Sequence, residues 1–293
     1  ISVNPSLSII YKLNYAWRFT VHASYKERYG EMTDLYDRPY QTDYRNSVWN
    51  CGILPVYRQQ LYSVYGEYKS TAREFFATVN LTHNREWYNR IYEQRIENGQ
   101  VQRVSLPLSN HGSGYTVKST LSKGFYDLGL KTSLMALLNI SKAEQISGGQ
   151  RLPYQYRLMR LEPKVIWTPN RHWETSYQTD IRYGGSKIGE RTRLAPLWNV
   201  IQQVQLSYIF SPIEASLSVD HYHNDVNEDQ SVNAVFADFS VLWKSRRWQI
   251  TATATNLFNK RTYAYTRYAS LESYTSWVRI RPREFLVAIR YRL

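Results

Sequence analysis

Apolar and polar side chains alternate along most of this chain of 293 residues. Between Trp248 and Thr255, for example, tryptophan, isoleucine and alanine alternate with glutamine and threonine, and residues 284–293 largely repeat the alternation. A period of two places successive side chains on opposite faces of a β-strand. The pattern therefore predicts an all-β protein whose strands each have one apolar and one polar face.

About thirteen segments with this alternation follow one another along the chain. They lie near residues 7–13, 17–26, 62–69, 75–82, 115–121, 128–139, 159–167, 173–183, 204–210, 213–220, 235–243, 248–255 and 285–293. Tight turns join some of them, and longer loops are predicted at 30–55, 84–113, 141–150, 184–193, 224–229 and 259–274. Short turns on one side and long loops on the other are typical of outer-membrane barrels, in which the turns face the periplasm.

Tryptophan recurs next to the tight turns. The residues in question are Trp17, Trp167, Trp173, Trp243 and Trp248. Indole rings at one consistent level form the aromatic girdle of a membrane protein, because the ring contacts acyl chains while its N–H reaches the headgroups. A soluble β-sandwich has no need of indoles beside every turn on one side, so we predict a transmembrane antiparallel up-and-down β-barrel.

Hydropathy is consistent with this fold. The longest apolar run, Leu134 to Leu138, is far shorter than the ~18 residues of a membrane helix. A membrane barrel alternates lipid-facing and lumen-facing side chains, so its mean hydropathy is that of a soluble protein, as is the value of -0.54 here. The membrane is therefore predicted to be crossed by strands.

The predicted strand count is odd, whereas bacterial single-chain barrels have an even number of strands. Unpaired backbone groups in hydrocarbon cost several kcal/mol each, so an open sheet edge is not viable there. Either one strand escapes the pattern or other polypeptide closes the barrel. Because the chain begins at Ile1 without an initiator methionine or a signal segment, we interpret it as a processed product or as part of something longer.

The C-terminal segment resembles a known family. Its residues are NLFNK at 256–260 with Tyr263, RPREF at 281–285 and IRYRL at 289–293. This combination is similar to the C-terminal signature of TonB-dependent outer-membrane receptors, with a Bacteroidetes-like character, although that family usually ends in phenylalanine and this chain ends in Leu293. The resemblance implies a barrel of about 22 strands with a plugged lumen. On that template, residues 1–293 form a single transmembrane barrel segment that lacks the N-terminal plug and the first strands.

The same resemblance implies a function and a set of partners. The function is import of a scarce solute, such as a chelate, an oligosaccharide or a peptide, across the outer membrane of a Gram-negative cell. The partners are the plug with its TonB box, the TonB–ExbB–ExbD complex, and the surrounding lipid and lipopolysaccharide. A surface lipoprotein is an additional candidate partner. Two alternatives stay open, namely a plugless channel or structural barrel subunit of an envelope assembly, and a barrel enzyme.

The polar faces of the predicted strands carry charged side chains that would face the lumen. They include Arg18, Lys131, Arg160, Arg182, Asp220 and Arg290. One interpretation is a polar wall that holds a plug and guides a solute. The alternative is simple cross-strand charge pairing and contact with water.

The long loops are rich in aromatic residues beside arginine and aspartate. The candidate ligand-binding residues are Tyr36, Arg38, Tyr40, Tyr44, Trp49, Trp87, Tyr88, Tyr265 and Tyr268. Rigid aromatic rings with polar tips suit the capture of a sugar, a peptide or a chelate. Packing of the loops on each other and on lipopolysaccharide is the alternative.

Other chemistry finds little support. Lys plus Arg exceed Asp plus Glu by 37 to 24, but the basic residues are spread along the chain without a nucleic-acid footprint. The single Cys51 offers no disulfide or redox motif. His221 and His223 with Asp225 share the spacing of metal ligands on a strand, yet interfacial histidines are commoner than ligands. We predict no nucleic acid, no metal, no cofactor and no enzymatic motif.

Overall fold

The structure is a computed structural model that describes residues 2–44, 46–97, 100–189, 192–226, 230–269 and 272–292, with the backbone alone at 96–97, 147, 192–195, 265–269 and 272–274. Within these residues the regular structure is almost entirely strand. The two helices are single turns of 3-10 type, η1 (Met32–Leu35) and η2 (Tyr126–Leu128). Neither has the length or the apolar character that a membrane-crossing helix requires.

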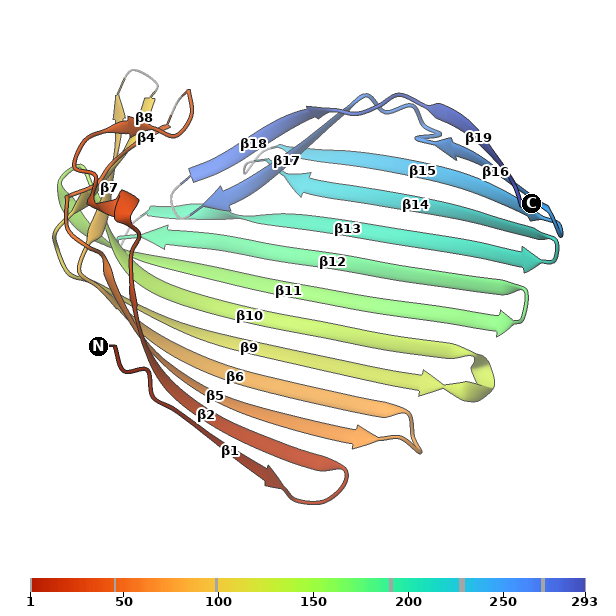
Figure 1. Cartoon of the computed structure of the whole chain (residues 1–293), viewed down its shortest axis with the longest axis horizontal. Helices are drawn as coiled ribbons and strands as arrows, with labels where there is room; N and C mark the ends of the chain where they lie inside the picture. Colours follow the sequence, from red (N-terminus) through yellow and green to blue (C-terminus); the bar gives the residue numbers. More distant parts are fainter. Residues whose placement is uncertain are drawn as a thin grey trace.

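One curved antiparallel sheet forms the wall of the molecule (Figure 1). Its strands are β1 (Ser6–Lys12), β2 (Trp17–Tyr29), β5 (Val56–Ser70), β6 (Phe75–Tyr88), β9 (Asn110–Phe125), β10 (Leu130–Ser147), β11 (Gln150–Asn170), β12 (Trp173–Ile188), β13 (Thr192–Phe210), β14 (Ile213–Asp225), β15 (Ser231–Lys244), β16 (Trp248–Thr255) and β19 (Glu284–Tyr291). Each pairs with the next in an up-and-down order. The predicted all-β, up-and-down architecture is confirmed, and the described residues contain the thirteen wall strands that the pattern indicated.

The two margins of the sheet are β1 and β19. Within the described chain, β1 pairs with β2 only and β19 pairs with β16 only. Figure 1 shows these strands on opposite sides of the hollow that the sheet encloses. Each of them therefore has an edge whose backbone N–H and C=O groups have no strand partner here.

Shorter strands build the end of the molecule at which the long loops lie. They are β3 (Tyr40–Gln41), β4 (Asn46–Trp49), β7 (Ile91–Glu97), β8 (Gln100–Leu106), β17 (Thr262–Ala269) and β18 (Glu272–Arg279). β7 and β8 form a hairpin, β4 runs parallel to β8, and β7 meets β10 where β10 extends past β9. β17 and β18 form a separate hairpin. The two longest loops before residue 110 are thus tied into one small assembly.

Two loop predictions were wrong in the middle of the sheet. Residues 141–147 continue β10, and residues 184–188 continue β12, so these segments are extended hairpins and not irregular loops. Gly148 and Gly149 alone connect β10 to β11, with φ of +57° and +75°. Positive φ at both positions is what a two-residue type I′ turn needs, and glycine adopts it without a steric penalty. The Ser-Gly-Gly sequence marks this tight hairpin.

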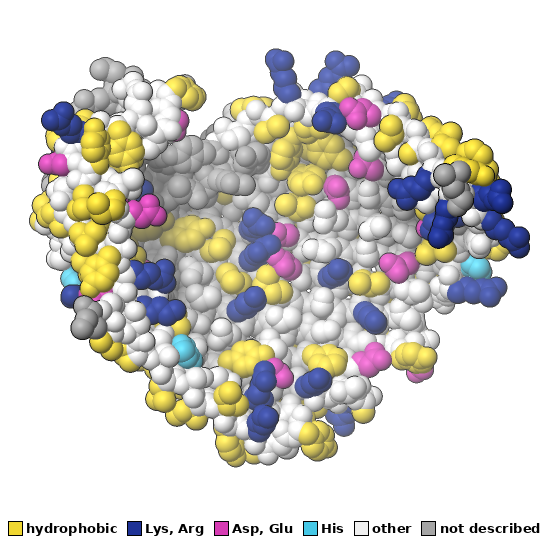
Figure 2. Space-filling view, viewed as in Figure 1, with side chains coloured by type: hydrophobic (Ala, Val, Ile, Leu, Met, Phe, Trp, Pro, Cys, Tyr) yellow, Lys and Arg dark blue, Asp and Glu magenta, His cyan; other side chains and the backbone are white. Residues whose placement is uncertain are grey.

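The register assigns each side chain to one of the two faces of the wall. Directly opposed residues share a face, so the pair Arg18–Glu67 lies on one face and the pair Trp17–Tyr68 lies on the other. Within the described residues no second layer of protein covers the apolar face, since Val21 and Val287 are 48% and 63% exposed. Figure 2 looks into the hollow and shows Lys, Arg, Asp and Glu side chains scattered across it. The charged face is therefore the inner one, and the apolar face points outward.

Candidate functional site

The five predicted girdle tryptophans lie on the outer face, next to the tight turns. Three of them oppose a tyrosine directly in the register. The ring centroids are 4.8 Å apart in Trp17–Tyr68, 4.6 Å in Trp173–Tyr208 and 4.7 Å in Trp248–Tyr291. Such tilted aromatic pairs stabilise a sheet beyond the area that they bury. The two remaining tryptophans, Trp167 and Trp243, are 48% and 37% exposed on the same face.

A second aromatic level lies nearer the loops and was missed from the sequence. Trp198 and Tyr183 oppose each other with ring centroids 4.6 Å apart. Along β12 and β13 this pair is ten residues from Trp173–Tyr208. Ten residues at about 3.3 Å each, tilted by about 40°, give a height of about 25 Å, which is that of the apolar band of an outer-membrane barrel. The ten-residue spacing of aromatics on one face was the signal available in the sequence.

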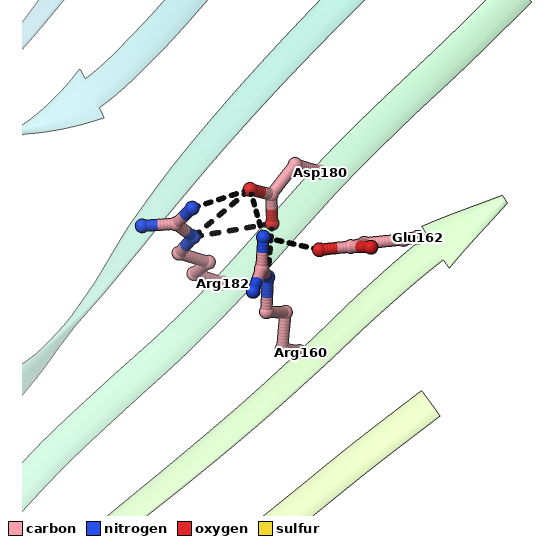
Figure 3. A network of polar contacts seen from close by, with 4 residues as sticks. All are labelled: Arg160, Glu162, Asp180 and Arg182. Atoms are coloured by element: carbon pink, nitrogen blue, oxygen red, sulfur yellow. Dashed lines mark hydrogen bonds and ion pairs between the residues drawn. The ribbon is translucent and has the colours of Figure 1, made fainter. Parts of the chain in front are cut away.

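Arginine and acidic residues form a network on the hollow face of β11 and β12 (Figure 3). Arg160 donates two hydrogen bonds to the Asp180 carboxylate, both of 2.9 Å, and also pairs with Glu162. Arg182 approaches the same carboxylate to 2.6 Å. The bidentate geometry matches the guanidinium fork to the carboxylate. Two of the predicted lumen-facing residues therefore meet at Asp180.

The other predicted lumen-facing residues lie on the same face. Arg18 pairs across β2 and β5 with Glu67 at 2.8 Å. Lys131 opposes Gly124, Asp220 opposes Gln203, and Arg290 opposes Gln249. Charge pairing across strands thus accounts for Arg18 and Arg160, and Arg182 pairs with Asp180 of its own strand. Guidance of a solute by this face remains a prediction.

Glu86 organises a polar cluster on the hollow face that the sequence did not reveal. Its Oε1 accepts hydrogen bonds from Tyr57 (3.0 Å), Gln59 (3.0 Å) and Asn84 (2.8 Å), and its Oε2 accepts one from Tyr88 (2.9 Å). Four neutral donors therefore stabilise one carboxylate near the loop end of β5 and β6. Asn84 and Tyr88 lie two residues from Glu86 on β6, whereas Tyr57 and Gln59 come from β5, and their approach is known only from the register.

Trp87 and Tyr88 belong to the end of β6, although the sequence analysis placed them in a loop. The paired alternation of β5 and β6 simply continues to Tyr57–Tyr88. Because neighbours on a strand face opposite ways, Tyr88 lies on the hollow face while Trp87 lies on the outer face. These two residues cannot contact the same ligand in the hollow.

The first long loop is held together by its own side chains. The Tyr36 and Tyr40 rings meet edge to face at 6.1 Å, and Trp49 donates its indole N–H to Asp37 at 3.2 Å. Tyr44 is 80% exposed and Arg38 is exposed as well. The side chains of Tyr265 and Tyr268 fall outside the described part of the structure. Loop packing therefore engages Tyr36, Tyr40 and Trp49, and ligand binding by this set stays a prediction.

An ion pair links the first long loop to the second. Arg90 lies 2.9 Å from Asp34 of η1. Burial by itself would raise the pKa of Asp34, but the hydrogen bonds from Arg90 and from the Glu31 backbone N–H outweigh it and leave this pKa below its usual value. Arg90 and Arg103 also lie over the ring of Tyr92, at 5.0 and 3.7 Å from its centroid. The two loops are thus electrostatically coupled.

A cavity of about 610 Å³ opens where these loops meet the rim of the sheet. Its lining residues are Thr42, Asp43, Asn46, Ser47, Val48, Tyr92, Glu93, Gln94, Val101, Arg103, Asn110, Ala143, Glu144, Gln145, Ile146 and Tyr154. None of the predicted ligand-binding residues whose side chains are described is among them. The cavity is formed by tertiary contacts between three separate segments, so no local sequence pattern indicates it.

The C-terminal signature forms a hydrogen-bonded unit at the base of the last loop. The Asn256 side chain donates to the carbonyls of Lys260 (2.7 Å) and Arg281 (2.8 Å), and it accepts from the Lys260 N–H (2.9 Å). Arg283 donates its backbone N–H to Asn259 at 3.1 Å. Asn256 and Asn259 both have positive φ, which asparagine tolerates better than most residues. The hydrogen bonds of the NLFN run therefore hold the beginning of the last loop, at residues 256–260, next to its end, at residues 281–283.

The last loop also packs against the hollow face of the wall, through Tyr263. Tyr263 of β17 packs edge to face against Tyr222 at 5.3 Å, with Phe236 at 6.4 Å. Its hydroxyl accepts a hydrogen bond of 2.6 Å from Asn224. The β17–β18 hairpin lies next to the loop ends of β14 and β15 (Figure 1). This loop narrows the hollow at its outer end.

His223, one of the two histidines of the candidate metal site, forms ordinary polar contacts. His223 lies 3.2 Å from Asp225 and hydrogen-bonds to Asn233 at 2.9 Å. In the described residues no group of three or more potential ligands could hold a metal ion. The nearby residues 227–229 lie outside the described residues.

Comparison with known proteins supports the fold. A scan of family models finds no match, and a search of curated proteins finds none. The FrpB iron transporter of Neisseria meningitidis (F3-3 variant) matches with a TM-score of 0.54 and 9% identity, over 91% of this chain and 44% of that chain. P. aeruginosa FpvA, solved with pyoverdines bound, matches with a TM-score of 0.51 and 10% identity, over 100% and 44%. The chain thus spans less than half the length of these proteins.

This chain has the fold of an outer-membrane β-barrel. At such low identities the likeness establishes the architecture alone, and the structure adds a sheet whose outer face is apolar and is not covered by any other described part of the chain. Closed barrels and helices are the structures that satisfy backbone polar groups inside a bilayer. The location in the outer membrane of a Gram-negative cell follows from this fold.

Proposed function

We propose that this chain is the C-terminal part of the barrel of a TonB-dependent outer-membrane receptor, of Bacteroidetes-like character, that imports a scarce solute. Residues 1–293 then form a single transmembrane segment of a barrel of about 22 strands. Polypeptide outside this segment supplies the plug and the first strands. That polypeptide pairs with the open edges of β1 and β19, because unpaired backbone groups in hydrocarbon cost several kcal/mol each.

The observation that carries this proposal is the unit built by the C-terminal signature. Asn256, Asn259 and Arg283 hold the base of the last loop together through hydrogen bonds. The residues that resemble the family signature therefore perform one structural task, directly before the last wall strand. They do so on a fold that is shared with TonB-dependent receptors.

The geometry supports a route for the solute. Loops at the outer end capture it, movement of the plug driven through TonB opens the lumen, and the solute passes along the hollow face. The ion pairs around Asp180 keep this part of the wall polar and hydrated while compensating the charges of their own members. The partners are the plug, the TonB–ExbB–ExbD complex, lipopolysaccharide around the outer girdle and, at the loops, a surface lipoprotein.

The test uses the protein encoded by the complete gene, purified in detergent. We expect it to bind the periplasmic domain of TonB, to lose this binding when the TonB box is deleted, and to show no ion conductance in planar bilayers. Stable single-channel conductance without TonB binding would overturn the proposal and favour a plugless channel. A protein that shows no conductance and does not bind TonB would also overturn the proposal, and this result would favour a structural barrel subunit.

A further inference from the structure

The cavity at the loop end is built on the hollow face of the wall. Its floor contains Asn110, Gln145 and Tyr154, and the register places all three on the face that also carries Arg160. Residues 42–43, 46–48, 92–94, 101 and 103 cover it. A molecule bound here would therefore lie at the entrance of the hollow. The volume of about 610 Å³ falls within the range of small-molecule sites.

The charged groups that line the cavity are already paired within the protein. The contacts are Asp43 with the Asn46 N–H and amide (2.9 and 2.7 Å), Glu93 with Arg95 (2.7 Å) and the Gly149 N–H (3.1 Å), and Glu144 with Arg151 (3.0 Å). The guanidinium of Arg103 lies over the Tyr92 ring. A charged ligand would have to compete with these contacts. The site thus favours a ligand without net charge.

Two buried amide atoms in the cavity have no hydrogen-bond partner among the described residues. They are Oδ1 of Asn110 and Nε2 of Gln145. The Asn110 Nδ2 is already engaged, because it donates to the Glu144 carbonyl at 3.0 Å. A buried polar atom left unsatisfied costs about 1–3 kcal/mol. Oε2 of Glu144, whose charge the ion pair with Arg151 compensates, also makes no hydrogen bond within the described residues. The cavity therefore presents one uncharged acceptor, one uncharged donor and one ion-paired carboxylate oxygen that a ligand would satisfy.

A hydroxyl group both donates and accepts a hydrogen bond, so one hydroxylated ring can satisfy both amides. The remaining lining includes Val48, Val101, Ala143 and the ring of Tyr154, which suit the C–H faces of such a ring. We propose that this cavity binds a neutral carbohydrate through Asn110 and Gln145. This assignment specifies the solute class of the proposed importer and rests on that function for its biological meaning, while binding itself needs no plug movement.

The experiment is a glycan array probed with the complete detergent-purified protein, with neutral and acidic oligosaccharides printed side by side. The strongest neutral glycan is then titrated by calorimetry. Asn110→Leu and Gln145→Met remove the amides at nearly constant volume. Each should weaken binding about five- to tenfold, the loss of one hydrogen bond. Gln178→Met is the matched control, because Gln178 is a hollow-face amide outside the cavity.

Circular dichroism and the heat-dependent shift in gel mobility check that each variant is folded. The proposal is overturned if no neutral glycan binds, if only acidic glycans, a ferric hydroxamate chelate or a tripeptide bind, or if both folded variants bind as tightly as the Gln178→Met control. Because the assay needs no TonB, sugar binding can succeed while TonB binding fails, and the reverse. The two proposals therefore fail separately.

Discussion

The wall and the loop end of this molecule are stabilised in different ways. In the wall, successive residues differ mainly by the face on which they lie, and the outer residue Val204 and the inner residue Gln205 are adjacent on β13. At the loop end, single side chains such as Asn256 hold several backbone groups at once. The wall therefore depends on the pattern of polarity, whereas the loop end depends on individual residues.

The largest effect should come from placing a charge on the wrong face of the wall. Val204→Arg puts a guanidinium between the two aromatic levels on the outer face, and we expect a loss of about 2–4 kcal/mol in the free energy of unfolding in lipid. Gln205→Arg on the hollow face should cost less than about 1 kcal/mol. Urea titration in lipid vesicles measures both. Equal losses would mean that the outer face does not contact acyl chains.

The next effect concerns one residue at the loop end. Asn256→Ala removes three side-chain hydrogen bonds and places alanine at a φ of +51°. We expect a loss of about 2–3 kcal/mol in local stability, seen as faster protease cleavage between residues 260 and 281. Asn259→Ala removes one hydrogen bond and should have about half this effect. An unchanged cleavage rate in Asn256→Ala would show that the signature does not close the loop.

A smaller effect is expected within the hollow of the wall. Asp180→Asn leaves Arg160 and Arg182 facing each other around a neutral amide, which should cost about 1–2 kcal/mol in the free energy of unfolding. Glu214→Gln is the control, since its pair with Lys244 is exposed and should contribute less than about 0.5 kcal/mol. Urea midpoints compare the two. Equal midpoints would indicate that water screens the network fully.

The smallest effect is a pH dependence of the first long loop. The lowered pKa of Asp34 means that its pairing with Arg90 stabilises the loop above the unfolded pKa, near 3.8, and is lost as pH falls through the folded value. Amide hydrogen exchange of residues 31–36, corrected for intrinsic rates, should therefore lose protection between pH 5 and pH 3. Asp34→Asn should show low protection at both pH values. The same pH response in wild type and variant would exclude this ion pair as its cause.

Much of the wall could be predicted because strand periodicity is a local property. The alternation around Val21 or Val287 requires only neighbours two residues away, and the indoles beside the turns mark one membrane interface. The extended hairpins beyond residues 141 and 184 were missed, because above the membrane both faces of a strand meet water and the alternation weakens. Trp87 and Tyr88 were misplaced for the same reason.

The sequence by itself determined which side chains share a face, because the two-residue repeat of a strand does not depend on what surrounds it. It also carried the signature that suggested a family. Only the tertiary structure decided which residues meet across strands, such as Asp180 with Arg160 or Glu86 with Tyr57 and Gln59, because register sets those distances. The cavity around Asn110 and Gln145 likewise exists only after segments some fifty residues apart come together, through contacts that no local pattern encodes.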